Sequence, residues 1–134
     1  MGTNIRDRFV DDETETILLS EREVIDHVAQ RQDLIKTLPA VQCEEGTAKG
    51  RRYIIDTGTH RIGRSATCEI WIEDDLASRE HAHIIYKEGK LLLRDNHSTN
   101  GTLLNGRKVA TSELADQDLI EIGSTVLIVE IPKK

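Results

Sequence analysis

The chain has 134 residues, a formal net charge of −6 and a pI of about 5.4, which is enough length for one domain with a hydrophobic core and an additional segment. An acidic chain is poorly suited to neutralising a nucleic-acid backbone, and an aromatic content of 3% leaves few rings for stacking on bases. No apolar run is long enough to cross a bilayer, and no secretory signal is visible. The sequence therefore predicts a soluble, cytoplasmic protein that has neither nucleic acid nor membrane as its partner. Two isolated cysteines, Cys43 and Cys68, suit reduced thiols in that compartment.

Residues 1–19 are polar and acidic, with four carboxylates between positions 11 and 15. Such a segment buries too little apolar surface to offset the entropy of ordering it, so we expect a disordered acidic tail. Thr14 and Thr16 lie within this acidic run. Two interpretations stay open for them: part of a solvated tail, or sites of phosphorylation.

Residues 20–38 are expected to form a helix. Ser20 followed by Glu23 has the spacing of a capping box, and Pro39 ends the segment. The apolar residues at near-helical spacing are Val24, Ile25, Val28, Ile35 and Leu38. A single helix of this length is marginal in water, so we expect it to dock on the following domain or on another chain.

From residue 39 to residue 134 the pattern changes to short strands and tight turns. The segments that we expect to be strands are Ala40–Cys43, Arg52–Ile55, His60–Ile62, Glu69–Ile72, Ala82–Lys87, Lys90–Asp95, Thr102–Leu104, Arg107–Val109, Leu119–Ile122 and Thr125–Glu130. Glu88-Gly89 and Asn105-Gly106 separate neighbouring strands as hairpin turns. About ten or eleven short strands without intervening helices indicate an all-β sandwich, whose loops cluster at the ends of the sheets.

Three loop-like clusters contain the residue types that hold an anion: 61–65, 76–81 and 98–102. They combine Arg, a permanent charge with forked donors, with Ser, Thr and Asn, which supply hydroxyl and amide donors. A phosphate needs this mixture of charge and directed hydrogen bonds, together with a geometry that backbone turns fix. The clusters are therefore candidate parts of a phosphate-binding site.

Three short motifs also resemble, in their order, the motif of the forkhead-associated (FHA) domain: Gly63-Arg64, Ser78-x-x-His81 and Asn100-Gly101. The resemblance covers roughly residues 39–131 and depends on three separate motifs in the expected order. It implies the FHA-like (SMAD/FHA) β-sandwich and a function as a phosphothreonine-peptide binding module.

The resemblance also implies roles for the residues that match it. Arg64 and Ser78 would hold phosphate oxygens, and Asn100 would grip the main chain of the peptide. Arg79 and Thr99, next to these positions, are candidates for further phosphate contacts.

Three further matches are structural in the family. His81 would brace the binding loop without touching the ligand. Gly63 would have a backbone role, because glycine permits close approach and unusual dihedral angles, and Gly101 would supply a turn.

The resulting hypothesis is a phosphothreonine-dependent adaptor that binds a phosphothreonine-containing protein in trans, or its own N-terminal segment after a Ser/Thr kinase has modified Thr14 or Thr16. Two alternatives stay open. The sandwich could be a scaffold that binds partners without phosphorylation, or it could be the regulatory FHA domain of a larger signalling enzyme such as a diguanylate cyclase.

Catalysis and metal binding are weaker interpretations of the same residues. Ser78 and His81 lie close to Asp74 and Asp75, but no nucleophile-elbow motif is present. His81 and His83 are two positions apart, yet no cysteine or carboxylate spacing completes a recognised metal site. We therefore expect no enzyme activity, no cofactor and no metal.

Overall fold

The computed structural model describes residues 37–133. The predicted acidic tail at 1–19 and all but the last two residues of the predicted helix at 20–38 lie outside the described residues. Within residues 37–133, no helix is long and apolar enough to span a membrane.

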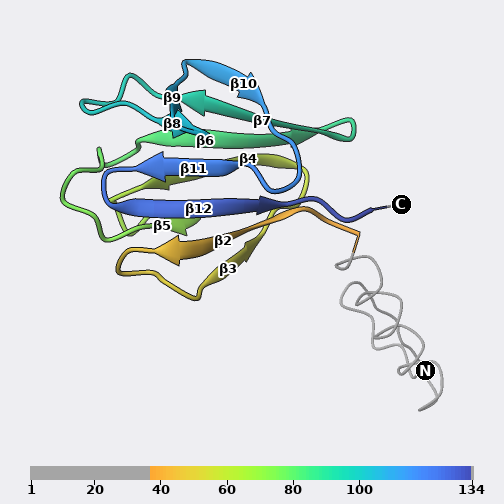
Figure 1. Ribbon diagram of the computed structural model, residues 1–134, viewed down its shortest axis with the longest axis horizontal. Coiled ribbons are helices and arrows are strands. Elements are labelled where there is room, and N and C mark those ends of the chain that lie inside the picture. Colours follow the sequence, from red (N-terminus) through yellow and green to blue (C-terminus); the bar gives the residue numbers. More distant parts are fainter. Residues whose placement is uncertain (1–36, 134) are drawn as a thin grey trace, which may run out of the picture. The chain divides into compact units, whose positions relative to one another are not determined.

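The described part of the chain forms eleven short strands in two sheets (Figure 1). The strands are β2 (Ala40–Glu45), β3 (Arg52–Ile54), β4 (Gly58–Gly63), β5 (Ile70–Trp71), β6 (Ala82–Lys87), β7 (Lys90–Asp95), β8 (Leu103–Leu104), β9 (Arg107–Lys108), β10 (Thr111–Glu113), β11 (Leu119–Ile122) and β12 (Thr125–Glu130). One sheet has the order β10-β7-β6-β4-β5, and the other has the order β3-β2-β12-β11-β8-β9. The predicted all-β sandwich is confirmed.

Two tight turns fix the register of their hairpins. Glu88 and Gly89 between β6 and β7 have φ of 53° and 76°, and Asn105 and Gly106 between β8 and β9 have φ of 51° and 85°. Two successive left-handed residues match the twist of the flanking strands. The sequence correctly indicated both turns, because Gly and Asn adopt positive φ most easily.

The core lies between the two sheets and is almost entirely aliphatic. Alternate residues of the strands point into it, as in β12, where Leu127 and Val129 are fully buried and their neighbours are partly exposed. The largest fully buried apolar side chains are Val41, Ile55, Ile62, Ile70, Ile72, Ile84, Leu93, Ile120, Ile122, Leu127 and Val129. Burial of each such side chain stabilises the fold by about 1.5–3 kcal/mol. This core anchors the strand ends from which the candidate binding loops emerge.

The two cysteines, Cys43 and Cys68, are free and buried. Desolvation by burial raises the pKa of the Cys43 thiol and of the Cys68 thiol. Both are therefore protonated thiols at neutral pH and unreactive.

The sequence pattern missed strand β10. Thr111–Glu113 has no buried apolar residue, and it is an edge strand that pairs only with β7 in the described sheets. Its existence depends on backbone hydrogen bonds to β7 and not on an alternating apolar pattern. The expected strand at His60–Ile62 is also longer, because β4 begins at Gly58.

Candidate functional site

Three loops meet at one end of the sandwich, on the left in Figure 1. One follows β4 (64–69), one links β5 to β6 (72–81), and one follows β7 (96–102). The end of β4 pairs with Ala82 at the start of β6, and Ala82 also pairs with Asp95, the last residue of β7. Strand register therefore brings together three clusters that are far apart in sequence.

Backbone hydrogen bonds join the first two loops. The Arg64 N–H donates to the Ser78 carbonyl at 3.0 Å, and the Ser65 N–H donates to the Arg79 carbonyl at 3.1 Å. The buried Cys68 thiol donates to the same Arg79 carbonyl at 3.2 Å. The residue after Gly63 is thus held directly beside the loop that carries Ser78.

Gly63 is required by this close approach. A Cβ added at Gly63 would lie 2.1 Å from the carbonyl oxygen of Arg79 and 2.7 Å from its carbonyl carbon. Both atoms belong to the backbone, so neither can move aside alone. Glycine at this position lets β4 and the segment before β6 pack against each other.

Arg64 is exposed, and a hydrogen bond from one of its guanidinium nitrogens, Nε, holds the side chain in place. Its Nε–H donates to the Ala77 carbonyl at 3.0 Å, while its own carbonyl accepts from Trp71 Nε1 at 3.1 Å. The other four guanidinium N–H groups make no hydrogen bond within residues 37–133. The side chain is therefore anchored and still has its forked donors available.

Arg61, near the end of the same strand, differs from Arg64 because its guanidinium is bound by neighbouring groups of the protein. Its guanidinium donates to both carboxylate oxygens of Glu69, at 3.0 Å and 2.8 Å, and to the Thr67 carbonyl at 2.7 Å. Side-chain hydrogen bonds from Arg61 lower the pKa of Glu69 to about 2. Arg61 thus fastens the loop that contains Arg64, and it is not available for a ligand.

Ser78, Thr99 and Asn100 come together where the second and third loops touch. The Thr99 N–H donates to Ser78 Oγ at 3.1 Å, and Asn100 Nδ2 donates to the Leu76 carbonyl at 2.8 Å. Because Ser78 Oγ accepts here, its hydroxyl proton stays free to be donated. Asn100 likewise keeps its second N–H and its Oδ1 for another partner.

His81 joins the same two loops from inside the protein. It is fully buried; its Nδ1 accepts from the Ser78 N–H at 2.9 Å, and its Nε2 lies 2.9 Å from the Gly101 carbonyl. A carbonyl can only accept, so Nε2 carries a proton and donates it to Gly101, while Nδ1 uses its lone pair to accept from Ser78. Gly101 adopts a φ of +85° to present that carbonyl.

Asp95 organises the third loop and was not singled out from the sequence. Its carboxylate accepts from the N–H and the hydroxyl of Ser98 and from the Thr102 hydroxyl at 2.7 Å. Burial acts to raise the pKa of Asp95, but the hydrogen bonds from Ser98 and Thr102 outweigh it and lower that pKa from its ordinary value. The spacing Asp-x-x-Ser is the sequence signal that could have indicated this turn.

Asp74 plays the same part in the second loop. It accepts from the Leu76 N–H at 2.9 Å, the Ser124 N–H at 2.8 Å and the Thr125 hydroxyl at 2.8 Å. Burial would raise the pKa of Asp74, and these hydrogen bonds lower it instead. The loop is thereby tied to the turn between β11 and β12, a contact that no local pattern predicts.

Arg79 is exposed, and its guanidinium has no ion-pair or hydrogen-bond partner within the described chain. The structure therefore gathers Arg64, Ser78, Thr99 and Asn100 on mutually bonded loops, with Arg79 next to Ser78 in the chain. Gly63, His81 and Gly101 lie in the backbone framework beneath them.

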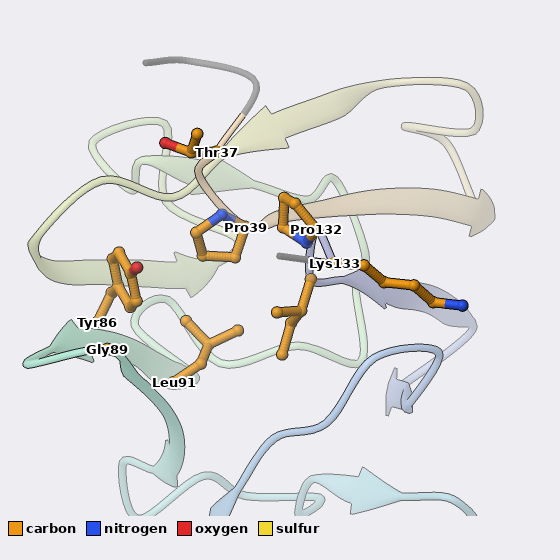
Figure 2. Close-up of a pocket in the computed structure, with 8 residues that line it drawn as sticks. Thr37, Pro39, Tyr86, Gly89, Leu91, Pro132 and Lys133 are labelled. Carbon is orange, nitrogen blue, oxygen red and sulfur yellow. The ribbon is translucent and has the colours of Figure 1, made fainter. Parts of the chain in front are cut away.

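Two hollows lie elsewhere on the domain. One, of about 340 Å³, is at the opposite end of β6, between Pro39, Tyr86, Leu91 and Ile131 (Figure 2). The other, of about 520 Å³, is lined by residues 73–76 of the second loop together with Gly46, Thr47 and Ser124. None of the predicted ligand contacts lines either hollow.

The geometry does not suit the rival interpretations of the same residues. Ser78 contacts His81 through its backbone N–H, and both ring nitrogens of His81 are already engaged, so no base is directed at the Ser78 hydroxyl. His83 pairs instead with Glu80 and Arg94. Among residues 37–133, no three His, Cys, Asp or Glu side chains gather as a metal site would require.

Comparison with known proteins identifies the family. The family model of the FHA domain matches residues 60–123. The oxoglutarate dehydrogenase inhibitor of Corynebacterium glutamicum is 30% identical over 115 residues, which are 83% of this chain and 80% of that protein. The chain therefore belongs to the FHA-domain family, as its three motifs indicated.

Solved structures agree with this assignment. A structure from a study of phosphothreonine-dependent FHA domain interactions has a TM-score of 0.68 and 34% identity, covering 73% of this chain and all of that one. The FHA domain of FhaA, solved in complex with the intracellular domain of Rv3910, has a TM-score of 0.65 and 34% identity, covering 69% of this chain and 99% of that one.

Some relatives are much longer proteins. FhaA of Mycobacterium tuberculosis is 35% identical over 95 residues, which are 71% of this chain and 18% of FhaA. In the ABC transporter ATP-binding/permease protein Rv1747 of the same organism, 42% identity extends over 71 residues, 53% of this chain and 8% of that protein.

Proposed function

We propose that this protein is a phosphothreonine-dependent adaptor, in which the three loops bind a phosphorylated threonine and the adjoining main chain of a partner. The observation that carries the proposal is the set of unused donors on mutually bonded loops. Each of three side chains makes one hydrogen bond between the loops and has further donors for a ligand: Arg64, Ser78 and Asn100.

The chemistry follows from the charges. A phosphothreonine carries a charge of about −1.5 to −2 at neutral pH and three acceptor oxygens. The Arg64 fork, the Ser78 hydroxyl and the side chains of Arg79 and Thr99 would supply charge-assisted hydrogen bonds to it. Asn100 would pair with a peptide N–H and C=O, which sets the register of the bound strand.

Preorganisation supports this assignment. The loops are already joined by hydrogen bonds through Ala77, Leu76 and the buried His81. Less ordering entropy is lost when the ligand binds to a site that is already formed. The FHA domain of the related FhaA was solved in complex with the intracellular domain of another protein, and this complex supports a protein partner for the present chain.

The direct test uses one synthetic peptide in three forms: phosphothreonine, phosphoserine and unmodified threonine. Isothermal titration calorimetry with the full chain should show binding of the phosphothreonine form, weaker binding of the phosphoserine form and none of the unmodified form. A scaffold that ignores phosphorylation would instead bind partner protein from kinase-treated and untreated samples equally, and that result would overturn the proposal.

We further propose a regulatory role for the acidic segment 1–19, in a domain order in which the helix predicted at 20–38 and the FHA domain at 39–134 follow it. A Ser/Thr kinase would modify Thr14 or Thr16, and the phosphorylated segment would occupy the site in its own chain or in a neighbouring one. Kinase-treated protein should then bind a phosphothreonine peptide more weakly than untreated protein. The double variant Thr14→Ala, Thr16→Ala should lose this difference; equal affinities before and after modification of the unaltered chain would exclude the mechanism.

The same interpretation assigns no catalytic activity and a cytoplasmic location. The names of some relatives, such as the oxoglutarate dehydrogenase inhibitor, are those of regulatory proteins.

A further inference from the structure

Lys108 lies beside the candidate site, although it belongs to none of the three loops. A Cβ added at Gly101 would lie 2.7 Å from Lys108 Cε and 3.4 Å from Cδ and Nζ. The aliphatic part of Lys108 therefore extends over the Gly101 backbone, and its ammonium group lies close to the residue that follows Asn100. Gly101, which has no side chain, leaves the space that Lys108 occupies.

The strand fixes the direction of this side chain. Lys108 pairs with Leu103 and Arg107 pairs with Leu104, so the two cations point to opposite faces of β9. Both are exposed. Lys108, which shares its face with Leu103, supplies the three atoms nearest to a Cβ built at Gly101.

No carboxylate neutralises Lys108 within the described part of the chain. Its ammonium group forms no ion pair or hydrogen bond there. The acidic residue that faces it is Glu121, which pairs with Leu103 from the other side of β8. Two strand spacings separate Glu121 from Lys108, or roughly 9–10 Å between backbones, and the structure shows no ion pair between them.

We propose that Lys108 is a specificity-determining residue, which makes the domain prefer partners that carry Asp or Glu next to the phosphothreonine. The inference rests on the proposed function and adds a charge selection to it. In a protein with a net charge of −6, an acidic peptide would otherwise be disfavoured by repulsion. The unpaired ammonium group of Lys108, next to the candidate site, would attract a carboxylate there and so offset this repulsion.

The expected difference in affinity between an acidic and a neutral peptide is that which one exposed ion pair contributes. Such pairs contribute little individually, so a peptide with glutamate on both sides of its phosphothreonine should bind roughly two- to five-fold more tightly than its glutamine counterpart. The preference should shrink as salt is added, because at about 0.1 M ionic strength the screening length is roughly 10 Å.

The test measures both peptides against three proteins by fluorescence anisotropy: the unaltered full chain, Lys108→Gln and Arg107→Gln. Glutamine keeps much of the aliphatic stem over Gly101 and removes only the charge. Arg107→Gln removes the same charge from the same strand on its opposite face. We expect Lys108→Gln to lose the preference for the glutamate peptide and to bind the glutamine peptide as before, while Arg107→Gln keeps the preference.

Equal weakening of both peptides by Lys108→Gln would overturn the inference, because it would show a structural effect and not charge selection. Equal loss of the preference in Arg107→Gln would also overturn it, because net charge alone would then be responsible. These failures differ from failure of the proposed function, in which the unaltered chain would bind neither phosphothreonine peptide.

Discussion

Replacing Arg64 by alanine is expected to abolish measurable binding of a phosphothreonine peptide. Removal of one partner from a well-formed charged hydrogen-bonded pair costs about 2–5 kcal/mol, and 2 kcal/mol already corresponds to roughly a thirty-fold change in Kd. Arg64 has its terminal donors free, while the neighbouring Arg61 is engaged by Glu69. Calorimetry with the same peptide for both proteins provides the measurement.

Two controls separate loss of ligand contacts from loss of structure. Arg64→Lys keeps a positive charge but lacks the forked donors and the Nε–H that holds the Ala77 carbonyl, so it should retain only part of the binding. Arg107→Ala removes an exposed arginine from β9 and should bind normally. Thermal unfolding of each variant verifies the fold. Binding of Arg64→Ala with unchanged affinity would show that the site is assigned to the wrong residues.

The strands were predictable where burial imposes alternation on the sequence. The hairpin of β6 and β7 has buried residues at alternating positions, Ala82 and Ile84 in β6 and Leu91 and Leu93 in β7, and a Glu88-Gly89 turn with positive φ. Strand β10 escaped prediction because its short edge segment has no buried side chain. Local chemistry indicates a strand only where one face of it is buried.

The candidate site was predictable as a set of residues but not as a geometry. Its clusters of Arg, Ser, Thr and Asn suggested a phosphate, and family resemblance assigned roles to them. The anchors Asp74 and Asp95 were missed, because their roles depend on partners that folding brings to them. The clearest case is the hydrogen bond between Asp74 and Ser124, which are 50 positions apart.

Replacing Gly63 by alanine is expected to destabilise the domain and to abolish binding together. The new Cβ would lie 2.1 Å from the Arg79 carbonyl oxygen. Gly63 does not have a positive φ, so the cost of the substitution comes from this clash and not from backbone strain. Overpacking of a filled site typically costs about 1–3 kcal/mol, and a clash with backbone atoms, which cannot move aside alone, should cost about 3 kcal/mol or more. For a domain of this size each kcal/mol lowers Tm by roughly 4–8 °C, so calorimetric melting should detect the change readily.

Gly89→Ala is the matched comparison, because a Cβ there meets nothing within 4 Å but the residue has a φ of +76°. Its cost should be only the conformational strain of about 1–2 kcal/mol, and the distant hairpin should leave peptide affinity unchanged. In Gly63→Ala, by contrast, relief of the clash must separate β4 from the segment before β6. That movement breaks the hydrogen bonds from Arg64 N–H to Ser78 and from Ser65 N–H to Arg79, which position the side chains that we propose to bind phosphate. A Gly63→Ala protein with unaltered Tm and peptide affinity would mean that these two segments do not touch in solution, and the site as described here would then not exist.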